Sequence, residues 1–368
     1  KYYFEKSLSL NNQNSELIFH LAILYYKTND LEKCLKNFHK LQKQDPNYLY
    51  LRYNLLNVLR SNLILELKKT NRELVEDLFL FLFKYKDIDH SAISQNVLFF
   101  LFNKKELKEL NNEEDLLTTN FIKRLIKKEL FHLILQKILL SDNDLEKTLT
   151  LIRRDLLLNK IEKNFLLDKK NNDFLISLAE QCWLNEYIWF VNKDEKTIIK
   201  NLVEKIENDS KIYESDIALL ACYLPLNSSN KIKKKLLDYK NNNVFFNDLI
   251  DVQIREPKNE LELKNNIKSV SRITDYVSSK VRNQYEENPY PRWRYCNQLF
   301  SIDFEKDVNI QIKPNKIKFV NKTDKLNILL AGCGTGKHLM SVGMYKNSNV
   351  LAIDLSLNSL AYAKRKVI

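Results

Sequence analysis

Glycine is scarce in this chain of 368 residues, which contains only four, and all four lie between positions 332 and 343. Between residues 62 and 265 there is no glycine at all and there are only two prolines, Pro225 and Pro257. Apolar residues recur through this stretch at spacings of three and four, the period of a helix with one buried face. The sequence therefore predicts an all-α region over 63–265 and one glycine-rich turn near the end of the chain.

Other absences narrow the class of protein. No uncharged apolar run approaches the roughly 18 residues that a membrane span needs, so we expect no membrane as a partner. The five cysteines show no C-x-x-C spacing and the five histidines do not cluster, so we expect no metal site. No signal peptide is visible, and unpaired cysteines of core type suit a reducing compartment, so we expect a cytoplasmic protein.

The charge is strongly positive, with a formal net charge of +12 and an isoelectric point near 9.2. Such a balance is typical of proteins that bind nucleic acid. Here the basic residues are spread over many predicted helices, and the densest run, at 231–235, is most simply a solvated helix face. The sequence is also rich in Lys, Asn, Ile and Leu throughout, as a composition bias would produce. We therefore do not expect nucleic acid as a partner.

The glycine-rich turn has the sequence Gly332-Cys333-Gly334-Thr335-Gly336. A short apolar run at 327–331 precedes it and predicts a buried parallel strand. Residues 337–345 can form a helix, and 349–353 predict a second strand that ends at Asp354. Strand, glycine turn, helix, strand and acid are the first half of a nucleotide-binding βαβ unit. In such a unit, backbone N–H groups face the ligand and the acid accepts hydrogen bonds from ribose.

The spacing within the turn separates three classes of nucleotide. A P-loop requires glycine at position 331 and Ser or Thr at position 338, where this chain has Ala331 and His338. The dinucleotide pattern G-x-G-x-x-G requires glycine at position 337, where this chain has Lys337. The turn instead matches G-x-G-x-G. A nicotinamide-dependent oxidoreductase stays open only if a dinucleotide binds despite Lys337.

The run Leu-Leu-Ala-Gly-Cys-Gly-Thr-Gly resembles the first motif of class I S-adenosylmethionine-dependent methyltransferases. The resemblance implies a Rossmann-like domain in which the turn lies against the methionine part of the cofactor and the acid binds its ribose. By that resemblance the cofactor-binding residues are Gly332, Cys333, Gly334, Gly336, Asp354 and Leu355. One position departs from the family, because many members have an acid two residues before the first glycine and this chain has Leu330.

A methyltransferase domain of this class normally has a seven-stranded sheet, and the chain closes after the second predicted strand and its helix. The chain also begins with Lys1, within an amphipathic stretch. We therefore expect a fragment of a longer enzyme, cut at both ends and inactive by itself. Its catalytic residues and its methyl acceptor are unknown from this sequence.

Residues 15–48 fit one 34-residue tetratricopeptide repeat. Ala22 and Cys34 are the small residues at which the two helices of such a repeat approach, and Pro46 ends the hairpin. Residues 1–14 are expected to form the second helix of a preceding repeat, and Leu49–Leu59 opens a partial third one. Stacked repeats commonly present a concave surface, so a protein or peptide partner is expected there. Helices that serve only as scaffold are the alternative.

An aromatic and proline-rich segment, Asn288-Pro289-Tyr290-Pro291-Arg292-Trp293, follows a predicted helix at 273–286. The two prolines fix an extended path and so hold the flanking side chains in set directions. By analogy with methyltransferase lids, the residues that could cover the cofactor and acceptor are Tyr285, Tyr290, Arg292 and Trp293. The alternative is a rigid hinge in which Trp293 is a packing plug.

Together with this segment and the glycine turn, the run Gln-Cys-Trp-Leu-Asn-Glu-Tyr at 181–187 resembles bacterial proteins that join tetratricopeptide repeats to a methyltransferase domain. The expected fold is mainly α, followed by the start of an α/β Rossmann-like domain. The expected divisions are repeats at 1–62, an all-α region at 63–265, a helix and linker or lid at 266–320, and the methyltransferase part at 321–368. The expected function is methyl transfer from S-adenosylmethionine. The alternative is a helical-repeat adaptor with a degenerate, non-catalytic Rossmann portion.

Overall fold

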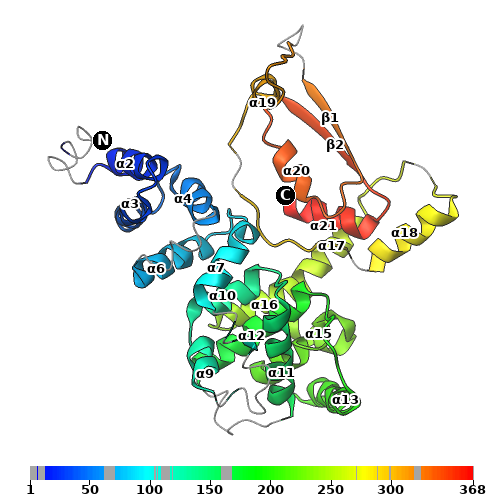
Figure 1. Ribbon diagram of the computed structural model, residues 1–368. Coiled ribbons are helices and arrows are strands. Elements are labelled where there is room, and N and C mark those ends of the chain that lie inside the picture. Colours follow the sequence, from blue (N-terminus) through cyan, green and yellow to red (C-terminus); the bar gives the residue numbers. More distant parts are fainter. Residues whose placement is uncertain are drawn as a thin grey trace. The chain divides into compact units, whose positions relative to one another are not determined.

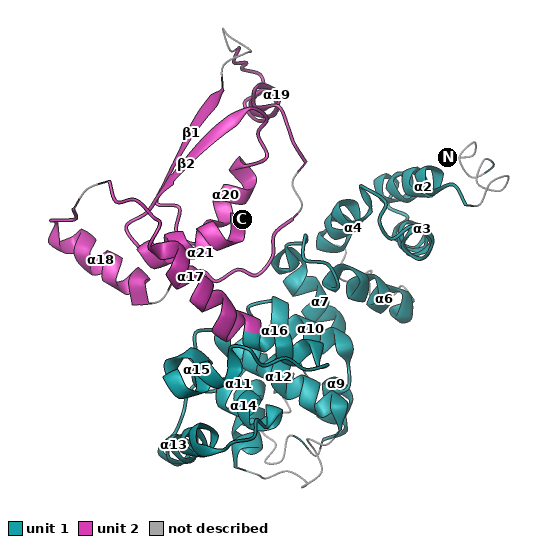
Figure 2. Cartoon of the chain, turned by 180° about the vertical axis from the view of Figure 1, so that it is seen from behind, with its two compact units in different colours: residues 1–250 teal, residues 251–368 magenta. Residues whose placement is uncertain are grey.

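The computed structural model describes residues 13–61, 71–102, 119–158, 168–270, 272–287, 289–297, 300–318 and 325–367, with the single positions 6, 105, 107, 108 and 117. The chain divides into two compact units, residues 1–250 and residues 251–368 (Figure 2). The mainly α fold class is confirmed, because helices dominate both units and the described strands form one two-stranded sheet. The expected divisions after residues 62, 265 and 320 stay predictions.

Helices are the only regular secondary structure in the described residues of unit 1 (Figure 1). Several of its helices follow an Asn or Asp whose side chain accepts hydrogen bonds from the first free N–H groups, as at Asn71, Asp142 and Asp168. The α-helices are α2 (Ser15–Lys27), α3 (Leu31–Gln44), α4 (Leu51–Arg60), α6 (Arg72–Phe83), α7 (Ser94–Leu101), α9 (Asn120–Ile126), α10 (Glu129–Lys137), α11 (Asn143–Leu157), α12 (Lys169–Leu184), α13 (Lys193–Asn208), α14 (Glu214–Ala221), α15 (Asn230–Leu236) and α16 (Val244–Ile250).

Helices α2 and α3 form a hairpin, as the repeat pattern predicts. Ala22 and Cys34 are completely buried, and α3 ends at Gln44, just before Asp45 and Pro46. These small residues allow close approach of two helices, since neither side chain holds the backbones apart. The predicted helix over residues 1–14 lies almost entirely outside the described residues.

Helix α12 is the core helix of unit 1 and packs against α10, α14 and α16. Nearly every side chain from Asn171 to Leu184 is buried. The Gln181 amide donates to the carbonyls of Leu135 and Ile138, at 2.8 and 2.7 Å, and accepts from the Leu140 N–H at 3.1 Å. A fully buried glutamine is therefore satisfied by the end of α10, and it ties that helix to α12.

Unit 2 contains the only sheet of the described residues. Its elements are the π-helix η5 (Asp251–Arg255), α17 (Glu256–Lys264), α18 (Tyr276–Glu287), α19 (Phe304–Gln311), β1 (Leu326–Ala331), α20 (Lys337–Val342), β2 (Ser348–Ile353) and α21 (Leu357–Val367). Strands β1 and β2 are parallel and pair from Leu326↔Ser348 to Ala331↔Ile353. The predicted strand–turn–helix–strand order is confirmed, and each strand begins one residue earlier than predicted.

Three details of unit 2 correct the sequence predictions. Helix α20 ends at Val342 rather than at residue 345, and Gly343 is its C-cap residue, whose N–H makes the last helical bond, to the Leu339 carbonyl at 2.8 Å. Helix α18 begins at Tyr276, three residues later than predicted. The strand expected to be buried is covered on one face only. Leu329 of β1 and Leu351 of β2 are 62% and 63% exposed, since exposure alternates along both strands.

Candidate functional site

The glycine-rich turn lies at the carboxyl end of β1 and is fixed to the end of β2. The N–H groups of Gly332 and Cys333 both donate to the carbonyl of Ile353, at 2.9 and 3.1 Å. Gly332, Gly334 and Gly336 all have positive φ, of 67°, 51° and 83°. L-residues with a side chain rarely adopt this region, so the turn requires glycine at each of these positions.

The three glycines differ in what lies in front of them. A Cβ at Gly332 or Gly334 would meet no atom within 4 Å, whereas a Cβ at Gly336 would lie 2.6 Å from the Ala363 Cβ of α21. Gly336 therefore allows α20 and α21 to approach each other. The space in front of Gly332 and Gly334 is open, so a ligand could approach the backbone closely at these two positions.

Asp354 follows β2 and contacts the turn directly. One carboxylate oxygen accepts from the Gly334 N–H at 2.8 Å, and the other accepts from the Ser356 N–H at 2.9 Å. A carboxylate can accept about four hydrogen bonds, so each oxygen can accept another one. The structure thus brings together the glycines and the acid that the sequence placed in one site. Leu355, the next predicted residue, is 43% exposed.

Cys333 is buried within the turn. Burial, together with the negative charge of Asp354, raises the pKa of its thiol to about 11. The thiol is therefore protonated at neutral pH and is not an activated nucleophile.

The segment from Pro289 to Arg294, which we call the proline segment, packs against the glycine turn. Thr335 Oγ1 donates to the Pro291 carbonyl at 2.7 Å, and Trp293 Nε1 donates to the Thr335 carbonyl at 2.9 Å. The Tyr362 hydroxyl of α21 donates to the Trp293 carbonyl at 2.6 Å. Trp293 is only 7% exposed, so it is a packing anchor, and its buried N–H is satisfied by the turn.

The other residues of the predicted lid lie differently. Tyr285 and Tyr290 are 40% and 53% exposed. Arg292 is half-buried. Burial raises the pKa of Glu260 on α17, and the nearby charges of Arg365 and, more weakly, Arg292 oppose that shift. Trp293 therefore has the packing role of the hinge alternative, whereas Tyr285 and Tyr290 stay candidates for a lid. Trp293 anchors the segment, whereas the two tyrosines present their rings to solvent.

Glu286 is a residue of this region that the sequence analysis missed. One of its carboxylate oxygens accepts from the N–H groups of Leu357 and Asn358, at the start of α21, and the other pairs with Lys264 at 2.9 Å. Partial burial raises the pKa of Glu286, but the hydrogen bonds from Lys264 and the α21 amides outweigh it, and the net pKa is lowered. About 70 residues separate Glu286 from these amides, so no local signal could have revealed the contact.

The neighbouring Tyr285 contributes its backbone to the same junction, because its carbonyl accepts from Ser356 Oγ at 3.0 Å. The end of α18 is thus bound to the loop after β2, and the proline segment is bound to the loop after β1. The two loops of the candidate site are therefore held by Tyr285 and Glu286 on one side and by Pro291 and Trp293 on the other.

No family model, curated protein or solved structure matches this chain. In the part of the chain that the structure describes, no helix is long and apolar enough to cross a membrane. The same residues contain no group of three or more His, Cys, Asp or Glu side chains that could hold a metal ion.

Proposed function

We propose that unit 2 binds S-adenosylmethionine at the glycine turn and belongs to a methyltransferase. The observation that carries this proposal is the 2.8 Å hydrogen bond from the Gly334 N–H to Asp354. This bond joins Asp354, the acid expected to bind ribose, to the backbone expected to contact the methionine part, and so supports the proposal. The positive φ angles at the three glycines and the motif resemblance support the same conclusion.

The residues fit such a cofactor in three respects. Open space before Gly332 and Gly334 admits a ligand to the backbone, and the carboxylate of Asp354 has acceptor capacity left for a ribose diol. The exposed ring of Tyr290 lies in a segment that is anchored to the turn, where a flat or cationic group could pack on it. When bound, the cofactor would supply an electrophilic methyl group, and these residues would orient it and exclude water.

Dinucleotide binding is the competing use of this turn. Lys337 occupies the position of the third glycine in the dinucleotide pattern, at the first residue of α20. We therefore propose the nucleoside cofactor rather than a nicotinamide dinucleotide. All five cysteines are free thiols, and we propose a cytoplasmic location on that basis.

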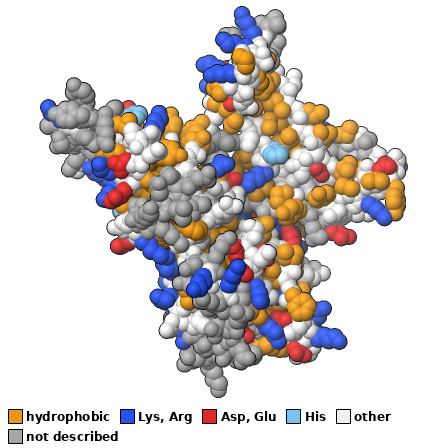
Figure 3. All heavy atoms as spheres, in the orientation of Figure 1, with side chains coloured by type: hydrophobic (Ala, Val, Ile, Leu, Met, Phe, Trp, Pro, Cys, Tyr) orange, Lys and Arg blue, Asp and Glu red, His pale blue; other side chains and the backbone are white. Residues whose placement is uncertain are grey.

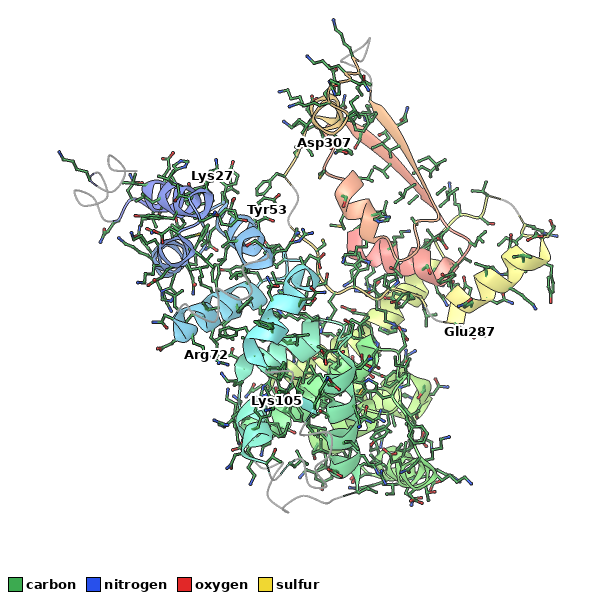
Figure 4. All side chains as sticks on the ribbon, viewed as in Figure 1. Lys27, Tyr53, Arg72, Lys105, Glu287 and Asp307 are labelled. Atoms are coloured by element: carbon green, nitrogen blue, oxygen red, sulfur yellow. The ribbon has the colours of Figure 1, made fainter. Side chains whose placement is uncertain are left out.

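The experiment is calorimetric titration of S-adenosylhomocysteine into the protein, compared with Asp354→Ala and Glu287→Ala variants. Glu287, labelled in Figure 4, is an exposed residue at the end of α18 and is the control for loss of one negative charge. We expect micromolar binding by the unaltered protein and the control, and at least a tenfold loss in Asp354→Ala. The order-of-magnitude basis is one or two charge-assisted hydrogen bonds, worth about 1.5–3 kcal/mol each.

A helical-repeat adaptor is the second candidate, favoured by the exposed side chains near the start of α4. Leu49, Tyr50 and Tyr53 are 57%, 45% and 44% exposed, and they could pack against a peptide. If the folded protein bound neither S-adenosylhomocysteine nor NAD⁺, the cofactor proposal would be wrong and the adaptor would remain. An adaptor would also keep its partner affinity unchanged in Asp354→Ala.

A further inference from the structure

The fold gathers lysines from four separate segments at the end of unit 2 where β1 begins. Figure 3 shows Lys and Arg side chains grouped in this part of the molecule, at the top of the view, around α19. Six of these lysines belong to the described residues of this region, and each of them is exposed. We call them the lysine surface: Lys306, Lys313, Lys316, Lys318, Lys325 and Lys346.

Hydrogen bonds fix the backbone that carries these lysines. The Asn309 side chain of α19 exchanges two bonds with the backbone of Ile317, at 2.7 and 3.0 Å, and so holds Lys316 and Lys318 beside the helix. The Lys346 N–H donates to the Ile302 carbonyl at 2.9 Å, next to the start of α19. The position of these positive charges is thus set by folding.

Lys325 joins the group through the start of the sheet. It directly precedes β1, whose first residue, Leu326, donates its N–H to the Asn347 carbonyl at 2.9 Å. Asn347 is the neighbour of Lys346, so this bond brings the segments that carry Lys325 and Lys346 side by side.

These six lysines have no carboxylate partner within the described ranges, whereas some lysines elsewhere in the chain are held by carboxylates or carbonyls. Lys205 pairs with Asp216 at 2.7 Å, and Lys264 pairs with Glu286 at 2.9 Å. Lys235, from the densest basic run of the sequence, donates to three carbonyls at the end of α13. Within the basic run at 231–235, Lys235 is therefore used in hydrogen bonds within the protein, whereas the lysine surface has no such role in the described residues.

Three acids lie on α19 or at its start: Asp303, Glu305 and Asp307. Asp303 accepts from the Lys306 N–H at 3.0 Å as a helix cap, and Asp307, labelled in Figure 4, accepts from the Tyr345 hydroxyl at 2.8 Å. With Glu305 they make three negative charges against six lysines, which leaves three net positive charges.

Against the expectation from the sequence alone, we propose that the lysine surface binds the phosphodiester backbone of a nucleic acid. Exposed amide side chains stand among the lysines, at Gln311, Asn315 and Asn347, and amides are common donors to phosphate and sugar oxygens. A membrane-binding surface would need a broad apolar face, and Ile310 is the large apolar side chain most exposed here, at 66%. The inference is independent of the proposed cofactor, because it concerns the opposite end of the strands.

The test is fluorescence anisotropy of labelled 20-nucleotide single-stranded RNA and 20-base-pair DNA between 50 and 300 mM salt. The variant replaces Lys313, Lys316, Lys318 and Lys325 by Gln. The matched control replaces four lysines of unit 1 in the same way: Lys200, Lys233, Lys234 and Lys240. Both variants lose the same charge, and circular dichroism establishes that each is folded.

We expect the surface variant to bind at least tenfold more weakly and its salt slope to fall by about 3, as four lost phosphate contacts predict. The control should stay within about twofold of the unaltered protein. The two nucleic acids distinguish a single-stranded from a duplex ligand. Equal losses in both variants, binding only to vesicles of anionic lipid, or no binding to either nucleic acid would each overturn the proposal.

Discussion

Gly336 and Gly332 both have a positive φ angle, but only Gly336 has a close neighbour in front of it. Alanine at each position therefore separates the cost of backbone strain from the cost of a packing clash. Gly332→Ala should cost about 1–2 kcal/mol from positive φ alone. Gly336→Ala should cost about 2–4 kcal/mol, because its Cβ would also lie 2.6 Å from Ala363. Urea unfolding measures both. Equal costs would show that α21 yields to the new methyl group without loss.

The raised pKa of Cys333 predicts low reactivity. At pH 8 its thiol should react with iodoacetamide far more slowly than an ordinary exposed cysteine, since only the thiolate reacts and the pKa is about 11. Removing the nearby charge in Asp354→Asn should speed the reaction, and mass spectrometry of the labelled peptide follows it. Rapid labelling of Cys333 in the unaltered protein would contradict the burial and charge argument.

At the scale of elements, Lys235 shows how a basic residue can be a helix cap. Its ammonium donates to the carbonyls of Ile206, Glu207 and Asp209, at 2.7, 3.0 and 2.6 Å, at the end of α13. Lys235→Met keeps the apolar stem and removes these bonds, so we expect a loss of about 1–3 kcal/mol in urea unfolding. Lys234→Met, at an exposed neighbour, is the control and should change stability little.

Local patterns predicted the elements of the site well, and contacts between elements poorly. The strands and the hairpin α2–α3 follow from periodicity and from the glycine and proline positions, which are local properties. The burial of Trp293 against Thr335, and of Glu286 on α21, depends on residues 42 and 71 positions apart. Arg153, fully buried and bonded to the carbonyls of Phe190 and Cys222, was equally invisible to local analysis, since arginine is rarely buried.

At the scale of the whole molecule, stability should depend on pH through a buried histidine of unit 1. Burial lowers the pKa of His132 from its ordinary 6.5 to about 4. Between these values the unfolded chain binds a proton that the folded chain excludes, so the free energy of unfolding falls as pH drops from 6.5 to 4. The loss is at most about 3 kcal/mol, from 1.36 kcal/mol per pKa unit.

The comparison that isolates this effect uses two histidine variants. His132→Phe keeps the ring contacts with Phe174 and Phe245, loses the 2.6 Å hydrogen bond to the Ile126 carbonyl, and should flatten the pH dependence between 6.5 and 4. His20→Gln, at a half-exposed position, should leave the dependence unchanged. An identical pH slope in His132→Phe and in the unaltered protein would assign the effect to other groups.

The central claim is that the carboxyl ends of β1 and β2 form a nucleoside site. Hydrogen–deuterium exchange with and without S-adenosylhomocysteine tests it most directly, because the backbone N–H groups of the turn are themselves the expected contacts. We predict slower exchange at 332–336 and 354–358, and no change at 313–318 on the lysine surface. Unchanged exchange at 332–336 under saturating ligand, or protection confined to other segments, would contradict the account.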